Sequence, residues 1–493
     1  MANISKAYML LASVASVSLM ATDAEAATAK EKQLEARIDA LERAFGSLQG
    51  ELQSSRTENA DLKAQLTAAT AQVSQVQAAV DTVQADQAAK PAPAPDGFTS
   101  GNGATRIKLG GYLKMVAAMS HFSNGSVTTN TLGRDFYLPQ AIPTAATGRS
   151  FTTEDFTAKQ TRLWLNLDTN VAGHVVKGYL ETDFQTTASA IENVAAGGSQ
   201  RTTNGYTLAL RRATMSVDRF TVGQDWTTFQ YTAALPESTD YVGGSEGTIF
   251  VRQPLIRYTA PLSKQVSLMV GVENPESALA TSGSAALLES GTDRLPDLTT
   301  RLTYSGARGE VSLARLVRQV RGESTGAALV NNTSVAGAVG NGLTKAGFGV
   351  SLGGKLFLNP AKASDVRFIA TYGQNIGRYV GLNFAPDAVY YPAINALTDV
   401  RVFAALASAH LAIAPQVRAN LMGSVQHVSY DAALPVASLA GLNKEAWSLA
   451  ANLFWSPVKS IDLGLEYRHG ERTLVSGANG QLDRVEFAAK YNF

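Results

Sequence analysis

The sequence predicts an all-β transmembrane barrel of about sixteen antiparallel strands, preceded by an α-helical coiled coil. Three observations support this fold class. Segments of alternating apolar and polar residues recur from residue 107 to the carboxy terminus, short and long connections alternate between them, and a heptad pattern precedes them. Beyond the amino-terminal segment, no stretch approaches the roughly 18 uninterrupted apolar residues that a membrane-spanning helix needs. If the chain spans a membrane, it must therefore do so with strands.

Residues 1–26 have the composition of a secretory signal peptide. Lys6 supplies the positive charge, the run AYMLLASVASVSLM supplies the apolar core, and the small residues at Ala24 and Ala26 mark a cleavage site. The alternative, a membrane-anchoring helix, would need a longer apolar run. We therefore expect the mature protein to leave the cytoplasm.

Residues 27–90 carry a heptad repeat, in which apolar residues follow one another at spacings of three and four. The pattern extends over about seven heptads and is interrupted only at Ser55 and Asn59. An amphipathic helix without a core of its own needs partner chains, so we expect an oligomeric coiled coil, although the heptads do not choose between a dimer and a trimer. The proline-rich segment 91–102 predicts an extended linker.

Residues 103–493 form the predicted barrel. Segments such as TRLWLNLDT, HVVKGYLETDFQ and SIDLGLEYRHG have the length of a tilted strand that crosses a bilayer. Short connections such as APLSK, LNPAKAS and SPVKS alternate with long ones at residues 122–156, 186–205, 226–250, 274–296, 322–342 and 378–397. In bacterial barrels the short turns are periplasmic and the long loops extracellular, so this alternation places both barrel ends and the coiled coil in the periplasm.

The terminal run RVEFAAKYNF shows the expected alternation. Val485, Phe487 and Phe493 lie on one side of the predicted strand, and Arg484 and Glu486 lie on the other. We expect the apolar side to face lipid. Further outward aromatic residues that would build the interfacial girdles are Trp447, Trp455, Tyr467 and Tyr491.

The opposite parity places charges of both signs inside the barrel. The predicted inward bases are Lys114, Arg162, Lys177, Arg212, Arg257, Arg301, Arg367, Arg418, Arg468 and Arg484, and the predicted inward acids are Asp168, Glu181, Asp183, Asp462, Glu466 and Glu486. For any single residue, a structural role in stiffening the wall is an alternative to a functional one. Clustering favours function, because Arg211, Arg212, Arg252 and Arg257 bracket one long connection.

That connection, TTFQYTAALPESTDYVGGSEGTIFVRQP, is rich in apolar and aromatic residues and carries the acids Glu237, Asp240 and Glu246. Apolar side chains exposed to water are costly, so we expect this loop to fold into the barrel and narrow it. The GGSEG stretch lacks the lysine and the spacing of a phosphate-binding loop and is interpreted as a turn.

Composition excludes several function classes. The chain has 42 Lys+Arg, 41 Asp+Glu and a net charge of +1, which gives no support for a nucleic-acid partner. With 0 Cys, disulfides, thiolate metal sites and cysteine nucleophiles are excluded. The 5 His are far apart in the sequence and no nucleophile motif accompanies them, so we expect no enzyme activity, no catalytic residues, no metal and no cofactor.

The chain resembles the DcaP-like trimeric porins of Gram-negative outer membranes. The resemblance is carried by IKLGGYLKMVAAM, VVKGYLETDF, LRRATMSVDRFTVGQDWTTF and PESTDYVGGSEGTIFVRQPLIRYT, preceded by the signal peptide and the heptads. It covers nearly the full length, and residues 208–259 are its most specific part.

The resemblance implies a sixteen-stranded homotrimer surrounded by outer-membrane lipid, with a periplasmic coiled coil and a preference for small anionic solutes, above all dicarboxylates. Its motifs place Arg211, Arg252 and Arg257 near the constriction, with Lys177 as a weaker addition beside the inward Arg162. Where the family has LRHAYG, this chain has LRRATM, so Arg212 replaces an imidazole. Strict alternation turns Arg211 away from Arg212, so we expect one of them at a subunit interface or at a bulge.

Two other interpretations remain open on sequence grounds. A sugar porin or general diffusion porin would line its path with aromatic residues, but the inward Tyr112, Tyr179 and Phe403 are too scattered to form such a track. A structural trimer could instead reach peptidoglycan with its coil and use the barrel only as an anchor. Channel conductance separates these, because a plugged anchor does not conduct.

Overall fold

The computed structural model describes residues 98–99, 105–129, 131–144, 148–186, 205–289, 293–323, 328–330, 333–335 and 342–493, together with scattered helical positions between residues 46 and 71. The chain divides into two compact units, Met1–Ala94 and Pro95–Phe493. The signal peptide, the heptad seam and most of the linker lie outside the described residues, so these three remain predictions. No helix in the described ranges is long and apolar enough to cross a membrane.

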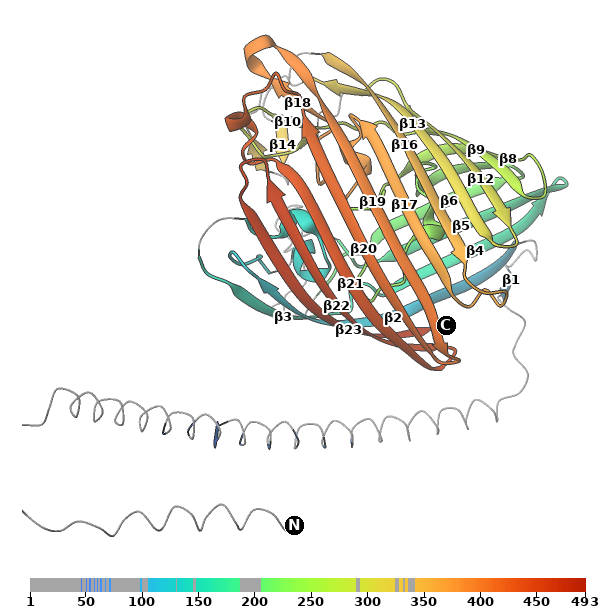
Figure 1. Ribbon diagram of the computed structural model, residues 1–493. Helices are drawn as coiled ribbons and strands as arrows, with labels where there is room; N and C mark the ends of the chain where they lie inside the picture. Colours follow the sequence, from blue (N-terminus) through green and yellow to red (C-terminus); the bar gives the residue numbers. More distant parts are fainter. Residues whose placement is uncertain are drawn as a thin grey trace, which may run out of the picture. The chain divides into compact units, whose positions relative to one another are not determined.

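The second unit is a closed antiparallel barrel with sixteen strand positions, as the sequence predicts (Figure 1). In order around the wall, the strands are β2 (Thr105–Phe122), β3 (Phe151–Thr157) together with β4 (Arg162–Val171), β5 (His174–Asp183), β6 (Ala209–Val217), β7 (Phe220–Trp226), β8 (Arg252–Pro261), β9 (Val266–Glu273), β12 (Asp297–Gly306), β13 (Gly309–Gly322), β16 (Leu343–Phe357), β17 (Asp365–Gln374), β19 (Ala396–Ala414), β20 (Val417–Tyr430), β21 (Asn443–Val458), β22 (Ile461–Leu474) and β23 (Asn479–Asn492). Pairing of β23 with β2 closes the barrel.

The remaining elements are short. They are β1 (Phe98–Thr99), α2 (Leu132–Asp135), η1 (Pro139–Ala141), η3 (Thr232–Ala234), β10 (Ala278–Thr281), β11 (Leu288–Glu289), β14 (Ala328–Val330), β15 (Thr333–Val335), η4 (Gly377–Tyr379), β18 (Ala388–Tyr391), η5 (Pro392–Ile394) and η6 (Val436–Leu439). Most lie in the predicted long connections, and β10 pairs with β18 in parallel, so two of these connections form a small sheet of their own.

The carboxy terminus completes the closure. The Phe493 amide donates to the Gly111 carbonyl at 3.1 Å, and the Gly111 amide donates back to the Phe493 carbonyl at 3.3 Å. The Phe493 side chain is 49% exposed on the outer surface, as its parity predicts. Because a membrane offers no water to unpaired backbone groups, these last hydrogen bonds remove a free edge.

Side chains alternate across the wall as a membrane barrel requires. On β22, Leu465 and Tyr467 point outward and are exposed, whereas Glu466 and Arg468 point inward and are each 2% exposed. This reverses the arrangement of a soluble sandwich, in which the charged face is the exposed one. The charged parity therefore marks the lumen along this wall.

One wall position is shared by two strands. β3 pairs with residues 116–122 of β2, and β4 pairs with residues 105–112 of the same strand. The segment between them carries Lys159 and Gln160, both buried, and the Lys159 ammonium contacts Asp135 at 2.8 Å. The connection predicted at residues 122–156 is therefore shorter, because its last residues belong to the wall.

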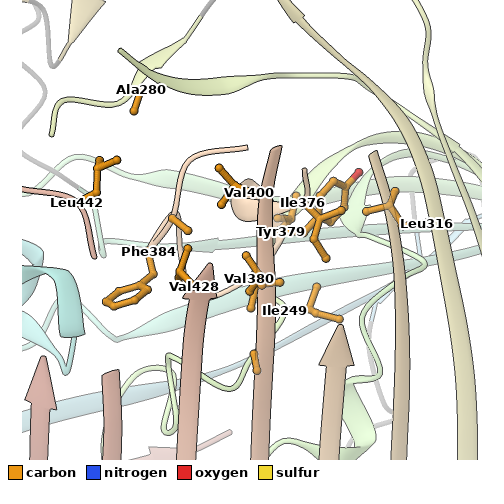
Figure 2. Packing of buried hydrophobic residues seen from close by; sticks show 14 of the residues in the cluster. Ile249, Ala280, Leu316, Ile376, Tyr379, Val380, Phe384, Val400, Val428 and Leu442 are labelled. Carbon is orange, nitrogen blue, oxygen red and sulfur yellow. The ribbon is translucent and has the colours of Figure 1, made fainter. Parts of the chain in front are cut away.

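The prediction that Phe403 faces the lumen is wrong. Phe403 is 45% exposed, whereas Val402 and Ala404 on the same strand are fully buried. The inner face of β19 is apolar because loops folded into the barrel cover it, as Figure 2 shows for Val400, Val380 and Ile249. Along this wall, apolar parity marks a packed core and does not mark lipid.

The loop between β7 and β8, residues 227–251, folds into the barrel, and we call it the constriction loop. Its glycines allow it to press against the wall. A Cβ atom added at Gly247 would lie 2.4 Å from the Ala405 carbonyl oxygen, and one added at Gly244 would lie 2.5 Å from the Leu406 side chain. The sequence GGSEG is therefore a site of close backbone approach to β19.

We predict that Gly247→Ala lowers stability by about 1 to 3 kcal/mol, because the new methyl group meets wall backbone that has no room to yield. Thermal unfolding in detergent measures the effect. The matched control is Gly205→Ala, where an added Cβ meets nothing within 4 Å. Equal unfolding temperatures for the two variants would contradict the close packing described here.

Candidate functional site: a loop between two charged walls

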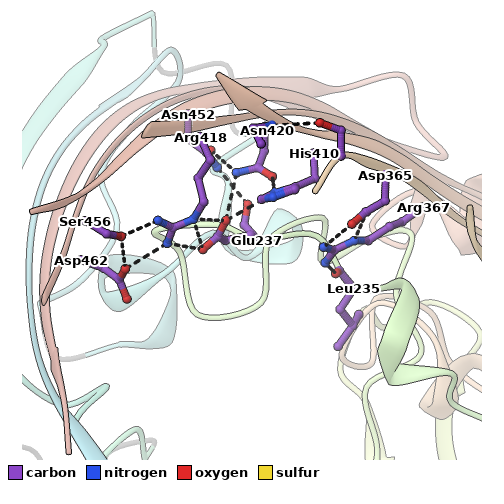
Figure 3. Close-up of polar contacts among 12 residues, drawn as sticks. Leu235, Glu237, Asp365, Arg367, His410, Arg418, Asn420, Asn452, Ser456 and Asp462 are labelled. Atoms are coloured by element: carbon purple, nitrogen blue, oxygen red, sulfur yellow. Dashed lines mark hydrogen bonds and ion pairs between the residues drawn. The ribbon is translucent and has the colours of Figure 1, made fainter. Parts of the chain in front are cut away.

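The first acid of the constriction loop faces the wall formed by β19 to β23. Glu237 accepts from the Arg418 guanidinium at 2.6 Å, and Arg418 also contacts Asp462 at 3.1 Å (Figure 3). Nearby, the Leu235 carbonyl accepts from Arg367 at 2.6 Å. The tip of the loop is thereby fastened to β17 and to this wall, and the Glu237 carboxylate is paired with Arg418.

The other two loop acids are also turned toward this far side. Asp240 accepts the Tyr137 amide at 2.6 Å and lies 4.0 Å from Arg484. Glu246 is fully buried, and the Tyr137 hydroxyl donates to it at 3.4 Å. Desolvation by burial raises the pKa of Glu246 above its ordinary value of 4.5. Within the described part of the chain, none of the three loop acids forms an ion pair with the arginines predicted for the constriction, Arg162, Arg211, Arg212, Arg252 and Arg257.

The five arginines predicted for the constriction gather on the opposite wall, formed by β4 to β8. Arg162 lies 3.0 Å from Glu181 and 2.8 Å from Asp183, and Arg211 lies 2.7 Å from the other oxygen of Asp183. The constriction loop reaches this wall through Tyr241, whose hydroxyl donates to Asp183 at 2.9 Å and accepts from Arg162 at 3.1 Å. Both guanidinium groups also lie over the Tyr241 ring, at 5.4 and 5.6 Å from its centroid.

A β-bulge resolves the parity of Arg211 and Arg212. The register between β5 and β6 shifts between Glu181 and Thr182, so Arg212 pairs with Glu181, Leu210 pairs with Thr182, and Arg211 is the extra residue. Both arginines can therefore contact inward carboxylates. The expectation that one of them lies at a bulge is confirmed.

Asp225 joins the next two arginines. Its two oxygens accept from Arg212 and Arg257, the latter at 3.0 Å. Arg257 also donates to the Trp226 carbonyl at 2.7 Å and to the Thr228 hydroxyl at 3.1 Å, at the start of the constriction loop. This carboxylate therefore fixes the spacing of two guanidinium groups.

Arg252 differs from the other four arginines. Its guanidinium carbon lies 3.9 Å from the centroid of the Trp226 ring and 5.0 Å from that of Phe250, and its Nε atom is buried without a hydrogen-bond partner. Within the described ranges it forms no ion pair. Its positive charge is held by aromatic faces and is not neutralised by a carboxylate.

The cluster as a whole carries a surplus of positive charge. It holds three carboxylates, those of Glu181, Asp183 and Asp225, and five guanidinium groups, those of Arg252 and of the four arginines that share these carboxylates, Arg162, Arg211, Arg212 and Arg257. Two positive charges therefore remain, on half-buried side chains. Because ions in a narrow protein passage are screened less than in bulk water, this local surplus outweighs the near-zero net charge of the chain.

Lys177 does not join this cluster. It is exposed on β5, four residues before Glu181, which corresponds to about 13 Å along a strand. Two residues that were not predicted from the sequence, Asp225 and Tyr241, do belong to the arginine cluster. Asp225 could have been found from the inward parity of β7, whereas no pattern in the sequence marks Tyr241.

The described residues contain no group of three or more histidines and carboxylates arranged to hold a metal ion. His121 and His469 both flank Asp483 on the outer surface, from the two strands that pair with β23. The pair is on the opposite side of the wall from the arginine cluster.

We predict that Glu246→Gln becomes increasingly stabilising relative to the parent protein as pH rises. The pKa of Glu246 is raised in the folded state, so its favourable contribution is complete below the ordinary value of 4.5 and is lost as pH rises through the folded-state pKa. Unfolding temperatures between pH 4 and pH 8 test this. Glu471→Gln, at a solvent-accessible strand end, is the control and should show no such divergence. A constant difference between Glu246→Gln and parent would refute the assignment.

The comparisons with known proteins agree with this geometry. The model of the DcaP outer membrane protein family matches residues 99–493. Among solved structures, the outer membrane channel DcaP of Acinetobacter baumannii superimposes with a TM-score of 0.62 at 25% identity, covering 81% of this chain and 100% of that chain.

Other similar structures show lower agreement. OmpT of Vibrio cholerae has a TM-score of 0.46 at 9% identity, covering 79% of this chain and 98% of that one, and the anion-selective porin of Comamonas acidovorans has a TM-score of 0.45 at 12% identity, covering 79% and 100%. Among curated proteins, no sequence matches this chain. On the family match and its channel relative, the chain belongs to the DcaP outer membrane protein family and is an outer-membrane β-barrel channel.

Proposed function

We propose that this channel conducts small anionic solutes and prefers dicarboxylates, which it attracts to the arginine cluster of β4 to β8. The observation that carries the proposal is the uncompensated charge of Arg252 beside four arginines that share three carboxylates. A mobile anion can supply the negative charge that the wall lacks.

The arrangement of the fixed carboxylates supports entry of an anion. Asp183 is held by Arg162, Arg211 and Tyr241, and Asp225 is held by Arg212 and Arg257. These carboxylates are neutralised by the arginines that they position. The acids of the constriction loop are paired on the far wall and do not oppose an anion at the cluster.

Two carboxylates are recognised better than one by this cluster. A guanidinium group offers a planar fork of donors that matches a carboxylate, and a dicarboxylate can meet two such forks at once. Arg252 is one candidate fork, and Arg212, whose side chain is 28% exposed, is the second. Chloride and neutral sugars lack this paired geometry, which distinguishes the proposal from a sugar porin or a general diffusion porin.

We further propose that the functional unit is a homotrimer with the amino-terminal coiled coil in the periplasm. The heptads require partner chains, and the family resemblance indicates three. β2 begins and β23 ends at the short-turn end of the barrel, which the loop lengths predict to be periplasmic. A contact of this coil with peptidoglycan would be an addition to conduction and not its replacement.

We predict opposite effects on selectivity for two substitutions that each remove one charge. Arg252→Gln should shift the reversal potential in a salt gradient toward cation preference. It should also weaken block by succinate about ten-fold, since a charge-assisted hydrogen bond contributes roughly 1.5 kcal/mol. Asp225→Asn should increase anion preference, because it releases Arg212 and Arg257 from their shared carboxylate.

The matched control for this experiment is Arg315→Gln. Arg315 is exposed on the outer face of β13, so its substitution changes net charge by the same amount without touching the lumen. If all three variants keep the parent reversal potential and the same succinate block, selectivity is set elsewhere. If Arg315→Gln shifts the potential as strongly as Arg252→Gln, net charge and not the cluster is responsible.

We predict that unheated protein, chemically crosslinked in detergent, gives a trimeric product that dissociates on heating. A variant lacking residues 27–90 should give less of this product, because the coil holds the subunits together before the barrels pack. Size-exclusion chromatography with light scattering provides the mass. A dimeric product, or monomer alone, would contradict the assembly.

A further inference from the structure

A second loop is folded into the barrel beside the constriction loop. Residues 375–395, between β17 and β19, contain η4 and β18, and we call this segment the bracing loop. Tyr379 and Val380 are fully buried and Phe384 is 1% exposed, so the loop is packed as tightly as a soluble core (Figure 2). The constriction loop forms part of the surface that it packs against.

The bracing loop holds the end of the constriction loop by backbone pairing. Ile249 and Val380 form an isolated antiparallel bridge. The Phe250 amide donates to the Tyr379 carbonyl at 3.1 Å, and the Gly381 amide donates to the Thr248 carbonyl at 3.0 Å. This pairing fixes three consecutive residues of the constriction loop just before β8.

The bracing loop also reaches the start of the constriction loop, through the side chain of the same tyrosine. The Tyr379 ring lies edge-on to Phe229, with centroids 6.0 Å apart. Its hydroxyl accepts from Gln253 at 2.9 Å, Gln253 donates to Glu273 at 2.6 Å, and Glu273 accepts the Thr228 amide at 2.7 Å. Tyr379 therefore contacts both ends of the constriction loop. Its backbone pairs with Phe250 at the end of the loop, and its ring and this relay reach Phe229 and Thr228 at the start.

A buried ion network holds the bracing loop itself in place. Asp297 on β12 lies 3.4 Å from Arg318 on β13, 3.1 Å from Arg378, and 2.7 Å from the Tyr379 hydroxyl. Arg318 also pairs with Asp387 at 2.8 Å, and both of these side chains are fully buried. Charges removed from water in this way are retained only where they are paired in one geometry, so the network admits one position of the loop.

We propose that Tyr379 is a positioning residue for conduction: through it the bracing loop sets the constriction loop in its inward position, and with it the width and selectivity of the passage. The arginine cluster provides the charge, but Thr228 and Trp226, which accept from Arg257, lie at the same loop end that Tyr379 holds. The proposal needs only that the protein conducts. Conductance therefore tests it separately from the anion preference proposed above.

The first test is Tyr379→Phe, which keeps the ring and removes the hydroxyl. We expect the parent channel to open to one conductance level and the variant to show sublevels and a noisier open state, because the loop end becomes mobile. Each block by a dianion should last about two- to ten-fold less time than in the parent. The matched control is Tyr467→Phe, which removes a hydroxyl that donates to Asp483 at 2.6 Å on the outer face of the barrel. Heat-modified mobility and circular dichroism show that both variants are folded.

The second test separates loop positioning from general destabilisation by means of a disulfide. The chain has 0 Cys, so Ile249→Cys with Val380→Cys introduces the only two thiols. Antiparallel partners lie about 4.5 to 5.5 Å apart at Cα, which is within the range that a disulfide spans. Oxidation should leave the parent conductance unchanged and should restore a single conductance level in a Tyr379→Phe background, and reduction should reverse the rescue.

Three outcomes would overturn the proposal. The first is a folded Tyr379→Phe channel with parent conductance and noise. The second is formation of the disulfide in a folded Tyr379→Phe channel without return of the parent conductance, which would mean that Tyr379 does not act through the position of the loop. The third is failure of the two thiols to oxidise, which would show that the loops are not in contact. If Tyr379→Phe does not fold, the variant with Ile249→Cys and Val380→Cys in the parent background tests the contact between the two loops.

Discussion

Closure of the sheet between β2 and β23 is the constraint on which the rest of this structure depends. In a membrane the backbone hydrogen bonds must be satisfied within the protein, and the pairing that ends with Phe493 and Gly111 leaves the wall without a free edge. Once the wall is closed, every second side chain must point into the lumen. The arginines and carboxylates of the strands are therefore brought together whether or not they are close in sequence.

The lumen then separates into two electrostatic regions. On the side of β19 to β23, bases such as Arg418 and Arg484 meet acids of the constriction loop, so that wall anchors the loop. On the side of β4 to β8, the loop offers Tyr241 and no carboxylate. Four arginines share three acids there, and Arg252 stacks on Trp226. The loop thus makes the lumen asymmetric even though the chain carries a net charge of only +1. The anion preference proposed above rests on this asymmetry and not on overall charge.

The remaining part of the lumen resembles the interior of a soluble protein. Val400, Val402 and Ala404 of β19 pack against Ile249 and Val380 from two different loops. Such packing is dense and tolerates little displacement, so a loop held in it has one position. The apolar inner face therefore positions the loop beside the charged face, because it fixes the backbone from which Tyr241 and Phe250 approach the arginines.

The sequence by itself determined the strand class, the closed topology and the residue types of the site. Two-residue periodicity and alternating loop lengths depend only on local chain geometry and on the contrast between lipid and water, so they can be recognised in the sequence. The inward parity of Arg162, Arg212 and Arg257 was correct for the same reason. Only the tertiary structure decided which charges neutralise one another, because pairing depends on register, on the bulge beside Arg211 and on where a long loop returns to the wall. Phe403 shows the limit of periodicity: an apolar face can be covered by lipid or by a loop, and only the fold determines which of the two covers it.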